Sequence, residues 1–515
     1  MGSSPDLLLG EQAEPALHLV DAAGLCRHLV DPHSVAALLA DHRHQLFPDE
    51  LFGDLFPSGR GRPSVPADVI ASVMVLQALE GLSDRDAAAQ LRTNIAWKVA
   101  CGLAIDDPGF HATVLTLWRN RLRTSARPQR IFDAVRAVVV ETGVLAKRQR
   151  RALDSTVLDD AVTRQDTLMQ LTAQIRVVRR LIPAARALQL TAHDYEQGGA
   201  KPACAWNDPV DINRVVTELV NDATTVLDTV RGLGLSDVQA EAVGLLALVS
   251  GQDVEPGDTE GTWRIAQRTA PDRIVSVHDP ESRHVHKTDH NYRDGFKAHV
   301  AVEPETGLVT ACDLTAGNVG DGQAAPALLA HEHPGLEILA DSAYGSGACR
   351  ANLLAARHLA VIKPIPLRAT VPGGFSIDDF AIDVASRSAT CPAGRTVPIT
   401  DSGSAKFGSR CDECSLRSRC TTARNGRDLK VHRHYGLLAA ARRQAETETF
   451  QRTYTQWWPM VERSLAWLVR KGHRRVAYRG MDRHRIWLSH RVAAVNLRRL
   501  LNLGLTKTTN GWTVA

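Results

Sequence analysis

Residues 296–314 read FKAHVAVEPETGLVTACDL, and this stretch decides the fold class. Apolar and polar side chains alternate in FKAHVAV and, after a break, LVTACDL resumes as a second short run, which is typical of paired β-strands. Between the two runs, residues 304–307 (PETG) have the composition of a turn. The stretch therefore predicts a β-hairpin.

Helices and strands alternate after this hairpin. A helix is predicted from about Asp321, followed by a short strand EILAD that ends at Asp341, a helix through CRANLLAARH and a strand LAVIKPI. Strands that alternate with helices are typical of a mixed α/β unit. We therefore expect a mixed sheet with a carboxylate, Asp341, at the end of one strand.

A second strand of this kind lies upstream. After the basic run KRQRR (147–151) comes ALDSTVLDDAV, in which we expect Asp154 to stand at the end of the strand. Asp159 and Asp160 are neighbouring alternatives, but we expect both to follow the strand. Because an aspartate at a strand end is often only a turn or cap residue, position alone assigns no function here.

The segments around this unit have other patterns. Residues 66–123 predict several short helices with tight turns, which fit either a helix-turn-helix or a plain helical bundle without DNA contact. Residues 162–252 repeat with the 3.6-residue period of helices and are interpreted as an insertion. Residues 370–435 lose periodicity and are interpreted as a second insertion.

Three blocks of the sequence, in this order, carry a resemblance to a known family. LDSTVLDDAV, YRDGFKAHVAVEPETGLVTACDLTAGNVGDG and ILADSAYGS closely resemble the conserved blocks of bacterial insertion-sequence DDE transposases, which have an RNase H-like core. The resemblance implies that Asp154 and Asp341 are the first and second catalytic aspartates and lie on neighbouring strands. It also implies metal-dependent cleavage and strand transfer at the ends of an insertion sequence.

The chemistry of this reaction suits carboxylates at strand ends. Two divalent ions about 4 Å apart can activate the attacking oxygen, stabilise the leaving oxygen and neutralise the in-line transition state. Mg²⁺ prefers oxygen ligands and keeps several waters, so a few carboxylates suffice. We expect two Mg²⁺ or Mn²⁺ ions, bound by Asp154, Asp341 and a third carboxylate.

The third carboxylate is predicted to be Glu462, in PMVERSLAWLVRKG. An apolar stripe at Val461, Leu465 and Leu468 would pack this helix on the sheet, with Glu462 beside it. Relatives carry Tyr, Arg, this Glu and Lys at fixed spacing, whereas here Tyr454 and Arg452 stand out of step and Val469 occupies the Lys position, for which Arg470 and Lys471 are the alternatives. The alternatives for the third carboxylate are Asp482, Glu446 and Glu448.

Four of the nine cysteines crowd into one region. Cys391, Cys411, Cys414 and Cys420 include a CxxC pair, and their spacing predicts one tetrahedral, structural Zn²⁺. Reduced free thiols or a redox pair are the alternatives. Many relatives carry a similar cysteine-rich insertion.

Positive charge gathers at the C-terminus although the formal net charge is only +4. Residues 470–499 contain ten Arg or Lys and one acid, Asp482, which favours contact with a polyanion over a solvated face. We expect double-stranded DNA, both the terminal inverted repeats and the target, to contact three groups of residues. The first, in this C-terminal stretch, is Lys471, Arg474, Arg475 and Arg479. The second is Arg119 and Arg121, with Arg123 and residues 60–63 (RGRP), in the N-terminal region, and the third is Lys297 with His299 on one face of the hairpin.

Length and composition place the chain among multi-domain globular proteins. Its 515 residues suggest about three units, 44% of them are hydrophobic, and no apolar run is long enough to span a membrane. We expect a cytoplasmic, nucleoid-associated bacterial protein that acts as a homodimer.

The complete expectation is an RNase H-like mixed α/β core with insertions. It places a helical DNA-binding region at 1–146, core segments at 147–161 and 291–369, a mainly helical insertion at 162–290, the zinc insertion at 370–435, and the C-terminal helical part of the core with a basic end at 436–515. The alternative functions are an RNase H-like nuclease without strand transfer, and an inactive, zinc-containing DNA-binding protein.

Overall fold

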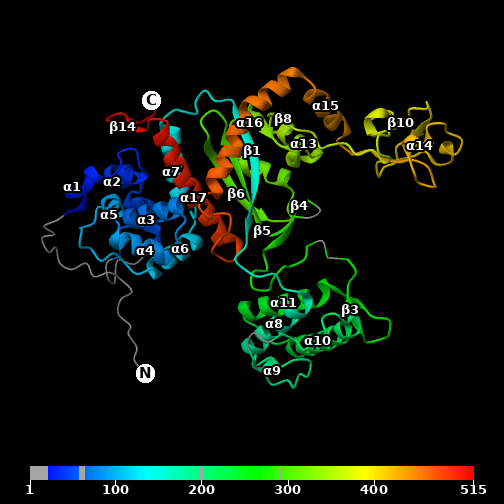
Figure 1. Cartoon of the computed structure of the whole chain (residues 1–515), viewed down its shortest axis with the longest axis horizontal. Coiled ribbons are helices and arrows are strands. Elements are labelled where there is room, and N and C mark those ends of the chain that lie inside the picture. Colours follow the sequence, from blue (N-terminus) through cyan, green and yellow to red (C-terminus); the bar gives the residue numbers. More distant parts are fainter. Residues whose placement is uncertain (1–20, 57–63, 198–200, 269, 271, 289–290) are drawn as a thin grey trace.

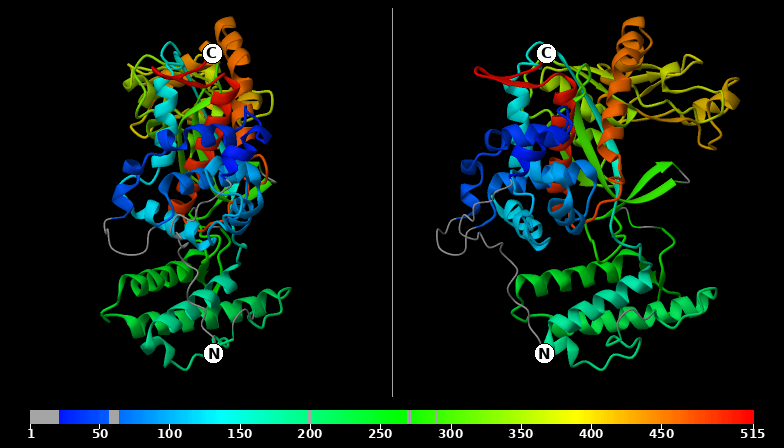
Figure 2. Two further views of the ribbon diagram at one scale, coloured as in Figure 1. Left: turned by 90° about the vertical axis from the view of Figure 1, so that its left-hand side faces the viewer. Right: turned by 60° about the vertical axis from the view of Figure 1, so that its left-hand side comes forward.

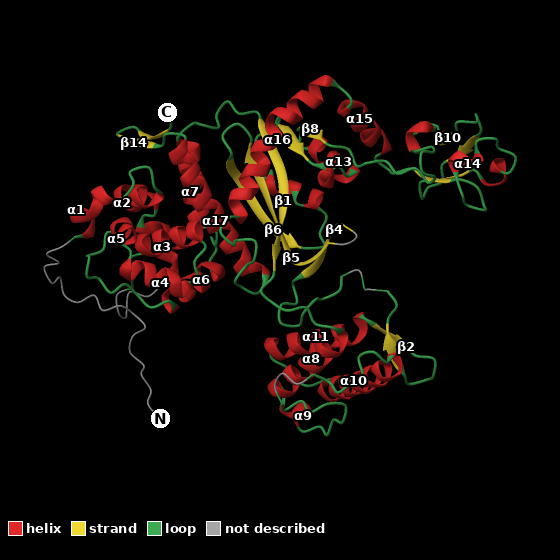
Figure 3. Cartoon of the chain, viewed as in Figure 1, coloured by secondary structure: helices red, strands yellow, loops and turns green. Residues whose placement is uncertain are grey.

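A central sheet carries three outlying parts in the computed structural model, which describes residues 21–56, 64–197, 201–268, 270, 272–288 and 291–515. The N-terminal helices lie on one side of the sheet, a helical insertion lies apart from it, and the cysteine-rich insertion stands at the far end (Figures 1 and 2). Figure 3 shows that the long strands gather in the centre, with helices around them. None of the helices in the described ranges combines the length and apolarity that a membrane crossing requires.

The sheet has the strand order of an RNase H-like core, which confirms the predicted fold class. Its strands are β1 Arg150–Asp159, β4 Arg283–Thr288, β5 Asn291–Glu303, β6 Leu308–Ala316, β7 Glu337–Ala340 and β8 Leu359–Ile362. Across the sheet the order is β6-β5-β1-β7-β8, and β4 pairs with the first part of β5. The pairs β1–β5 and β5–β6 are antiparallel, whereas β1–β7 and β7–β8 are parallel.

The predicted hairpin is β5 with β6, joined by the turn at residues 304–307. Glu303, which is fully buried, receives hydrogen bonds from the backbone N–H groups of Glu305 and Thr306 and so fixes this turn. The sheet begins earlier than expected, because β4 lies inside the predicted insertion of residues 162–290 but pairs with β5. Its pattern RHVHKT has little apolar alternation, so it gave no clear strand signal.

Helices cover both faces of the sheet because buried apolar side chains alternate along the strands. One face, with Leu153, Ile338 and Ile362, packs against α12 Ala325–Leu328 and α13 Gly347–Ala355. On the other face, Ala152, Leu339 and Val361 pack against α16 Glu448–Val469, which follows α15 Tyr435–Ala445.

The N-terminal helices share one core with the sheet and with α17 Met481–Asn502. They are α1 Ala22–Cys26, α2 Val35–Leu46, α3 Ala67–Glu80, α4 Asp84–Thr93, α5 Ile95–Cys101, α6 Thr113–Thr124 and α7 Arg130–Glu141. Gly81 ends α3 in the left-handed conformation, and Ser83 caps α4, as its sequence predicts. Arg491 of α17 is buried and donates to the carbonyls of Ala78 and Leu468, which ties α3 to α16 and α17.

The helical insertion has a core of its own. It contains α8 Thr167–Leu181, α9 Pro183–Arg186, α10 Pro209–Val230 and α11 Asp237–Gln252, followed by a small hairpin of β2 Val254–Pro256 and β3 Trp263–Ile265. Helical periodicity predicted the helices but not this hairpin.

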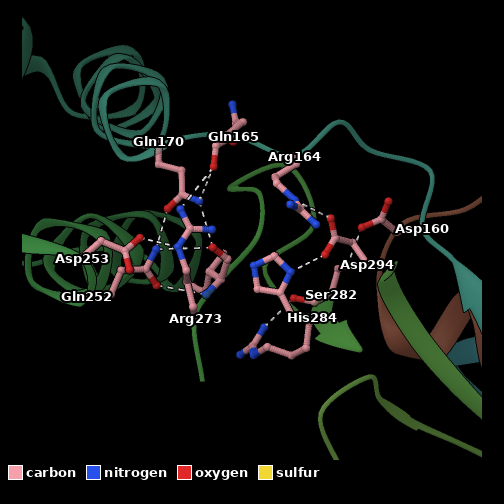
Figure 4. A network of polar contacts seen from close by, with 12 residues as sticks. Asp160, Arg164, Gln165, Gln170, Gln252, Asp253, Arg273, Ser282, His284 and Asp294 are labelled. Carbon is pink, nitrogen blue, oxygen red and sulfur yellow. Dashed lines mark hydrogen bonds and ion pairs between the residues drawn. The ribbon is translucent and has the colours of Figure 1, made fainter. Parts of the chain in front are cut away.

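Polar contacts, some of them buried, join the helical insertion to the sheet (Figure 4). Arg164 donates to Asp294 of β5 at 2.8 Å, and Ser282 donates to Asp160, directly after β1. Deeper inside, Gln165 accepts hydrogen bonds from the backbone of Val277 and the hydroxyl of Ser276. Because unpaired buried polar groups are costly, this network fixes both ends of the insertion.

The cysteine-rich insertion forms small sheets instead of an irregular loop. It contains β9 Ala381–Asp383, β10 Ser388–Thr390, β11 Thr396–Pro398, β12 Ser404–Lys406, α14 Arg417–Cys420 and β13 Asp428–Lys430. Phe380, Phe407 and Leu429 form its core together with Cys411 and Cys420. The strands are only three residues long, which is too short for a periodic signal. At the C-terminus, β14 Thr506–Thr508 and β15 Gly511–Thr513 form a last hairpin.

Gly295 tests the pairing of β1 with β5. Its φ is +147°, and a Cβ there would lie 2.1 Å from the carbonyl oxygen of Leu158. We expect Gly295→Ala to destabilise the sheet by roughly 2–4 kcal/mol in chemical denaturation. The control is Gly244→Ala in α11, where a Cβ meets nothing within 4 Å and should stabilise by about 0.5–1 kcal/mol. Equal effects of the two changes would contradict this packing.

Candidate active site at the edge of the sheet

Asp154 lies where the parallel part of the sheet ends. Leu153 pairs with Ala340, which is the last parallel pair between β1 and β7, so Asp154 and Asp341 are the next residues on two neighbouring strands. The prediction that Asp154 ends its strand is wrong, because β1 continues to Asp159. The strand continues because β5 keeps pairing with it after β7 has stopped.

Asp341 follows β7 directly and begins the 3-10 turn η5 Ser342–Tyr344. Its carboxylate accepts a hydrogen bond from the backbone N–H of Ala343 at 2.9 Å. Burial raises the pKa of Asp341, and the charge of Lys363 opposes that effect. The residue is therefore both a cap and a member of a charged cluster.

Glu462 reaches this cluster from α16. Val461 beside it packs in the same cluster as Ala152 and Leu339, and Trp458 donates to the Glu462 carboxylate at 3.0 Å. The carboxylates that raise the pKa of Asp154 are Asp341, Asp321 and Glu462. The alternatives for the third carboxylate, Asp482, Glu446 and Glu448, are not among these charges.

Burial is the largest influence on Asp154. It raises the pKa of Asp154 to about 7, and the negative charges nearby add to this shift, while a hydrogen bond from the backbone N–H of Ser155 opposes it. Tyr454 lies near the same carboxylates. Burial raises the pKa of its hydroxyl, and the charges of Asp341, Asp154 and Glu462 raise it further. Its buried hydroxyl has no hydrogen-bond partner among the described residues.

A fourth carboxylate, Asp321, was not predicted. It lies on the turn η4 Asp321–Gln323, accepts a hydrogen bond from the hydroxyl of Ser155 at 2.8 Å and pairs with Lys297 at 2.7 Å. Its charge raises the pKa of both Asp154 and Asp341. Asp321 stands in LTAGNVGDG, one of the blocks that carry the family resemblance. Its position in a turn gives no pattern that would distinguish it from an ordinary turn aspartate.

Lys297 and His299 support this cluster from β5, on one face as predicted. Lys297 is held by Asp321 and the carbonyl of Val319. His299 is fully buried between Tyr344 and Thr315, and burial lowers its pKa to about 4. The expected phosphate contact by these residues is corrected accordingly, since both side chains are engaged inside the protein.

The basic connection between α16 and α17 runs beside β1. The backbone of Arg474 accepts from Asp159, and the guanidinium of Arg474 donates to Thr156 at 3.3 Å. Lys471 and Arg475 line a cavity of about 710 Å³ between this connection and α3–α4. The side chains of Lys471, Arg475 and Arg479 form no ion pair within the described part of the chain.

Arg119 does not present a free charge, which corrects its assignment to DNA contact. It is buried, forms a bidentate pair with Asp84 at 2.8 and 3.0 Å, and lies over the ring of Tyr478. Arg121 remains exposed and lies over Phe56. Residues 60–63 lie outside the described residues.

The four clustered cysteines line one small cavity of about 20 Å³. They are Cys391, Cys411, Cys414 and Cys420, and burial raises the pKa of Cys420, to which the other three thiols add. Throughout the ranges that the structure describes, no three His, Cys, Asp or Glu side chains are placed closely enough to hold a metal ion as they stand.

Two family models match the chain. Residues 28–121, which include α2 to α6, match a transposase domain, and residues 390–501, which include Glu462, match a transposase DDE domain. Together these two matches support an insertion-sequence DDE transposase family. Searches of curated proteins and of solved structures gave no significant match.

This family membership confirms the resemblance and places the chain in a DNA-cleaving class of enzyme that acts on DNA and generally uses divalent metals. Asp154 and Asp341 lie outside the two matched segments, so their roles rest on the geometry described above.

Ionising Asp154 should cost stability. Its folded pKa of about 7 exceeds the ordinary value of 3.8, so the cost grows as the pH rises from about 4 to 7 and is complete above pH 7. In metal-free transposase at pH 8 we expect Asp154→Asn to stabilise the core by up to about 4 kcal/mol, with a benefit that shrinks toward pH 4. Thermal unfolding at both pH values measures this, with exposed Asp258→Asn as the control. A variant less stable than the wild type at pH 8 would contradict the buried charge.

Proposed function

We propose that Asp154, Asp341 and Glu462 together bind two divalent ions, Mg²⁺ or Mn²⁺, and that the transposase cleaves DNA at the ends of an insertion sequence and joins them to target DNA. The observation that carries the proposal is the row of carboxylates at the edge of β1 and β7, with Glu462 on the helix packed over it.

The residues of this edge suit a cation by their charge and by their oxygen atoms, and the described side chains would have to draw closer together to hold one. Burial and the charges of Asp341, Asp321 and Glu462 raise the pKa of Asp154, so a positive charge among these carboxylates would stabilise its ionised form. The buried hydroxyl of Tyr454 gives a second indication, because it needs a hydrogen-bond partner and none of the described residues supplies one. The oxygen-rich donor set is the one that Mg²⁺ and Mn²⁺ prefer.

When bound, two such ions would activate the attacking oxygen and neutralise the charge of the phosphodiester in its transition state. Asp154 and Asp341 would hold them, and Glu462 would complete one site. Water would attack the phosphorus at the element's end and release a 3′-hydroxyl, whose oxygen would then displace a 3′-oxygen of the target. Asp321 would keep Ser155 and Lys297 in place behind Asp154.

The remaining surfaces suit the DNA. We assign the terminal inverted repeats to the N-terminal helices, with Arg121, and backbone phosphates to Lys471, Arg474, Arg475 and Arg479, whose charges would give a steep salt dependence. Bringing two ends together favours a homodimer.

We also propose one structural Zn²⁺ at Cys391, Cys411, Cys414 and Cys420. The four cysteines line one shared cavity of about 20 Å³, their thiols are partly or fully buried, and four thiolates would leave no open position for catalysis. The ion would stabilise an insertion whose strands are only three residues long.

The catalytic proposal is tested by cleavage and joining of DNA fragments that carry the element's ends, with Mg²⁺ or Mn²⁺. We expect Asp341→Ala and Glu462→Gln to lower both reactions by on the order of 10³-fold or more while DNA binding persists. Glu446→Gln, on the exposed end of α15, is the matched control and should stay active.

Three results would change the assignment. A wild type that binds DNA but never cleaves it would favour the inactive binding protein, and cleavage without joining would favour a nuclease. Loss of activity in Glu446→Gln but not in Glu462→Gln would move the third carboxylate.

The zinc proposal is tested by metal analysis of protein purified without chelator. We expect about one zinc per chain in the wild type and in Cys204→Ser, and a large loss in Cys411→Ser, because three thiols bind zinc less tightly than four. Unchanged zinc content in Cys411→Ser would refute the site.

A further inference from the structure

Lys363 extends the row of charged residues by one strand. Ala340 pairs with Leu153 on one side and with Ile362 on the other, so the next residues along the three parallel strands are Asp154, Asp341 and Lys363. The backbone N–H of Lys363 donates to the carbonyl of Ala340 at 3.1 Å, which continues the ladder one residue past β8.

The side chain of Lys363 lies over α16 and not over the opposite face. Its ammonium is 4.3 Å from the centre of the Tyr454 ring. This ring stacks on Trp458, whose indole N–H holds Glu462. The same helix therefore supports the carboxylate and the cation of the site.

Lys363 keeps its charge available. Its ammonium has no ion-pair or hydrogen-bond partner among the residues that the structure describes, and its side chain is exposed. A cation over an aromatic face is positioned without being neutralised. Lys297, the other lysine near these carboxylates, is by contrast bound to Asp321.

The chemistry of the site needs such a cation. Asp154, Asp341, Asp321 and Glu462 repel a DNA strand wherever a metal ion does not screen them. On α16 the position at which relatives carry a lysine is Val469, which packs against the core.

We propose that Lys363, which directly follows β8, binds a backbone phosphate of the DNA strand that enters the carboxylate site. The inference rests on the proposed function. It assigns Lys363 to the substrate and not to the metal ions, which it would repel.

Two measurements on the full chain test this assignment. The first is the affinity for a DNA end in Ca²⁺ at several salt concentrations, comparing Lys363→Gln with Lys363→Arg, Tyr454→Phe and the control Lys201→Gln, an exposed lysine on the helical insertion. We expect Lys363→Gln to bind about tenfold more weakly and to reduce the slope of log K against log salt by about 1. Lys363→Arg and Tyr454→Phe, which keep the charge and the ring, should retain the slope.

The second measurement is Mn²⁺ binding without DNA, followed by the electron paramagnetic resonance signal of the free ion. Lys363→Gln should bind Mn²⁺ as tightly as the wild type or a few-fold more tightly, because a positive charge beside Asp341 is removed. The proposal would be overturned if Lys363→Gln showed the same salt slope as the control Lys201→Gln, or if Lys363→Gln bound Mn²⁺ more weakly than the wild type. A wild type that binds DNA but does not cleave it would refute the proposed function instead, and the salt slopes would still decide the role of Lys363.

Discussion

Backbone hydrogen bonds between β1 and β7, and between β7 and β8, hold Leu153, Ala340 and Ile362 in one line across the sheet. The residues that follow them are Asp154, Asp341 and Lys363. Because successive residues alternate between the two faces of a sheet, this register also brings these three residues to one face. This pairing therefore produces the row of charged residues on the face of the sheet that α16 covers. A shift by one residue would turn the carboxylates to the other face.

This arrangement costs stability in the metal-free protein. Burial and the charges of three other carboxylates oppose the ionisation of Asp154, and the buried hydroxyl of Tyr454 has no hydrogen-bond partner among the described residues. The surrounding structure tolerates this strain because Asp321 is fixed by Lys297 and Ser155, and because α17 joins the sheet to the N-terminal helices in one core. Polar groups that are destabilising in isolation are typical of sites that bind a charged ligand.

Much of the core could be predicted from local patterns, and the rest could not for physical reasons. The alternation of apolar and polar side chains predicted the β5–β6 hairpin, and the three blocks that resemble the transposase family predicted Asp154 and Asp341 as site residues. Arg119 was assigned to DNA because nothing near it in the sequence shows that it is buried. Its partner Asp84 lies 35 residues away, and Tyr478 lies in the connection between α16 and α17. The role of Asp321 likewise depends on contacts between distant segments, and the position of Lys363 depends on the register of three strands.

The central claim is that the edge of β1 and β7 holds divalent ions together with Glu462. The most direct measurement is anomalous X-ray diffraction from crystals of this 515-residue chain with a DNA end and Mn²⁺. The account predicts manganese peaks between the carboxylates of Asp154 and Asp341, with Glu462 bound to one of them. Manganese that binds elsewhere on the chain while this edge remains without a peak would contradict it.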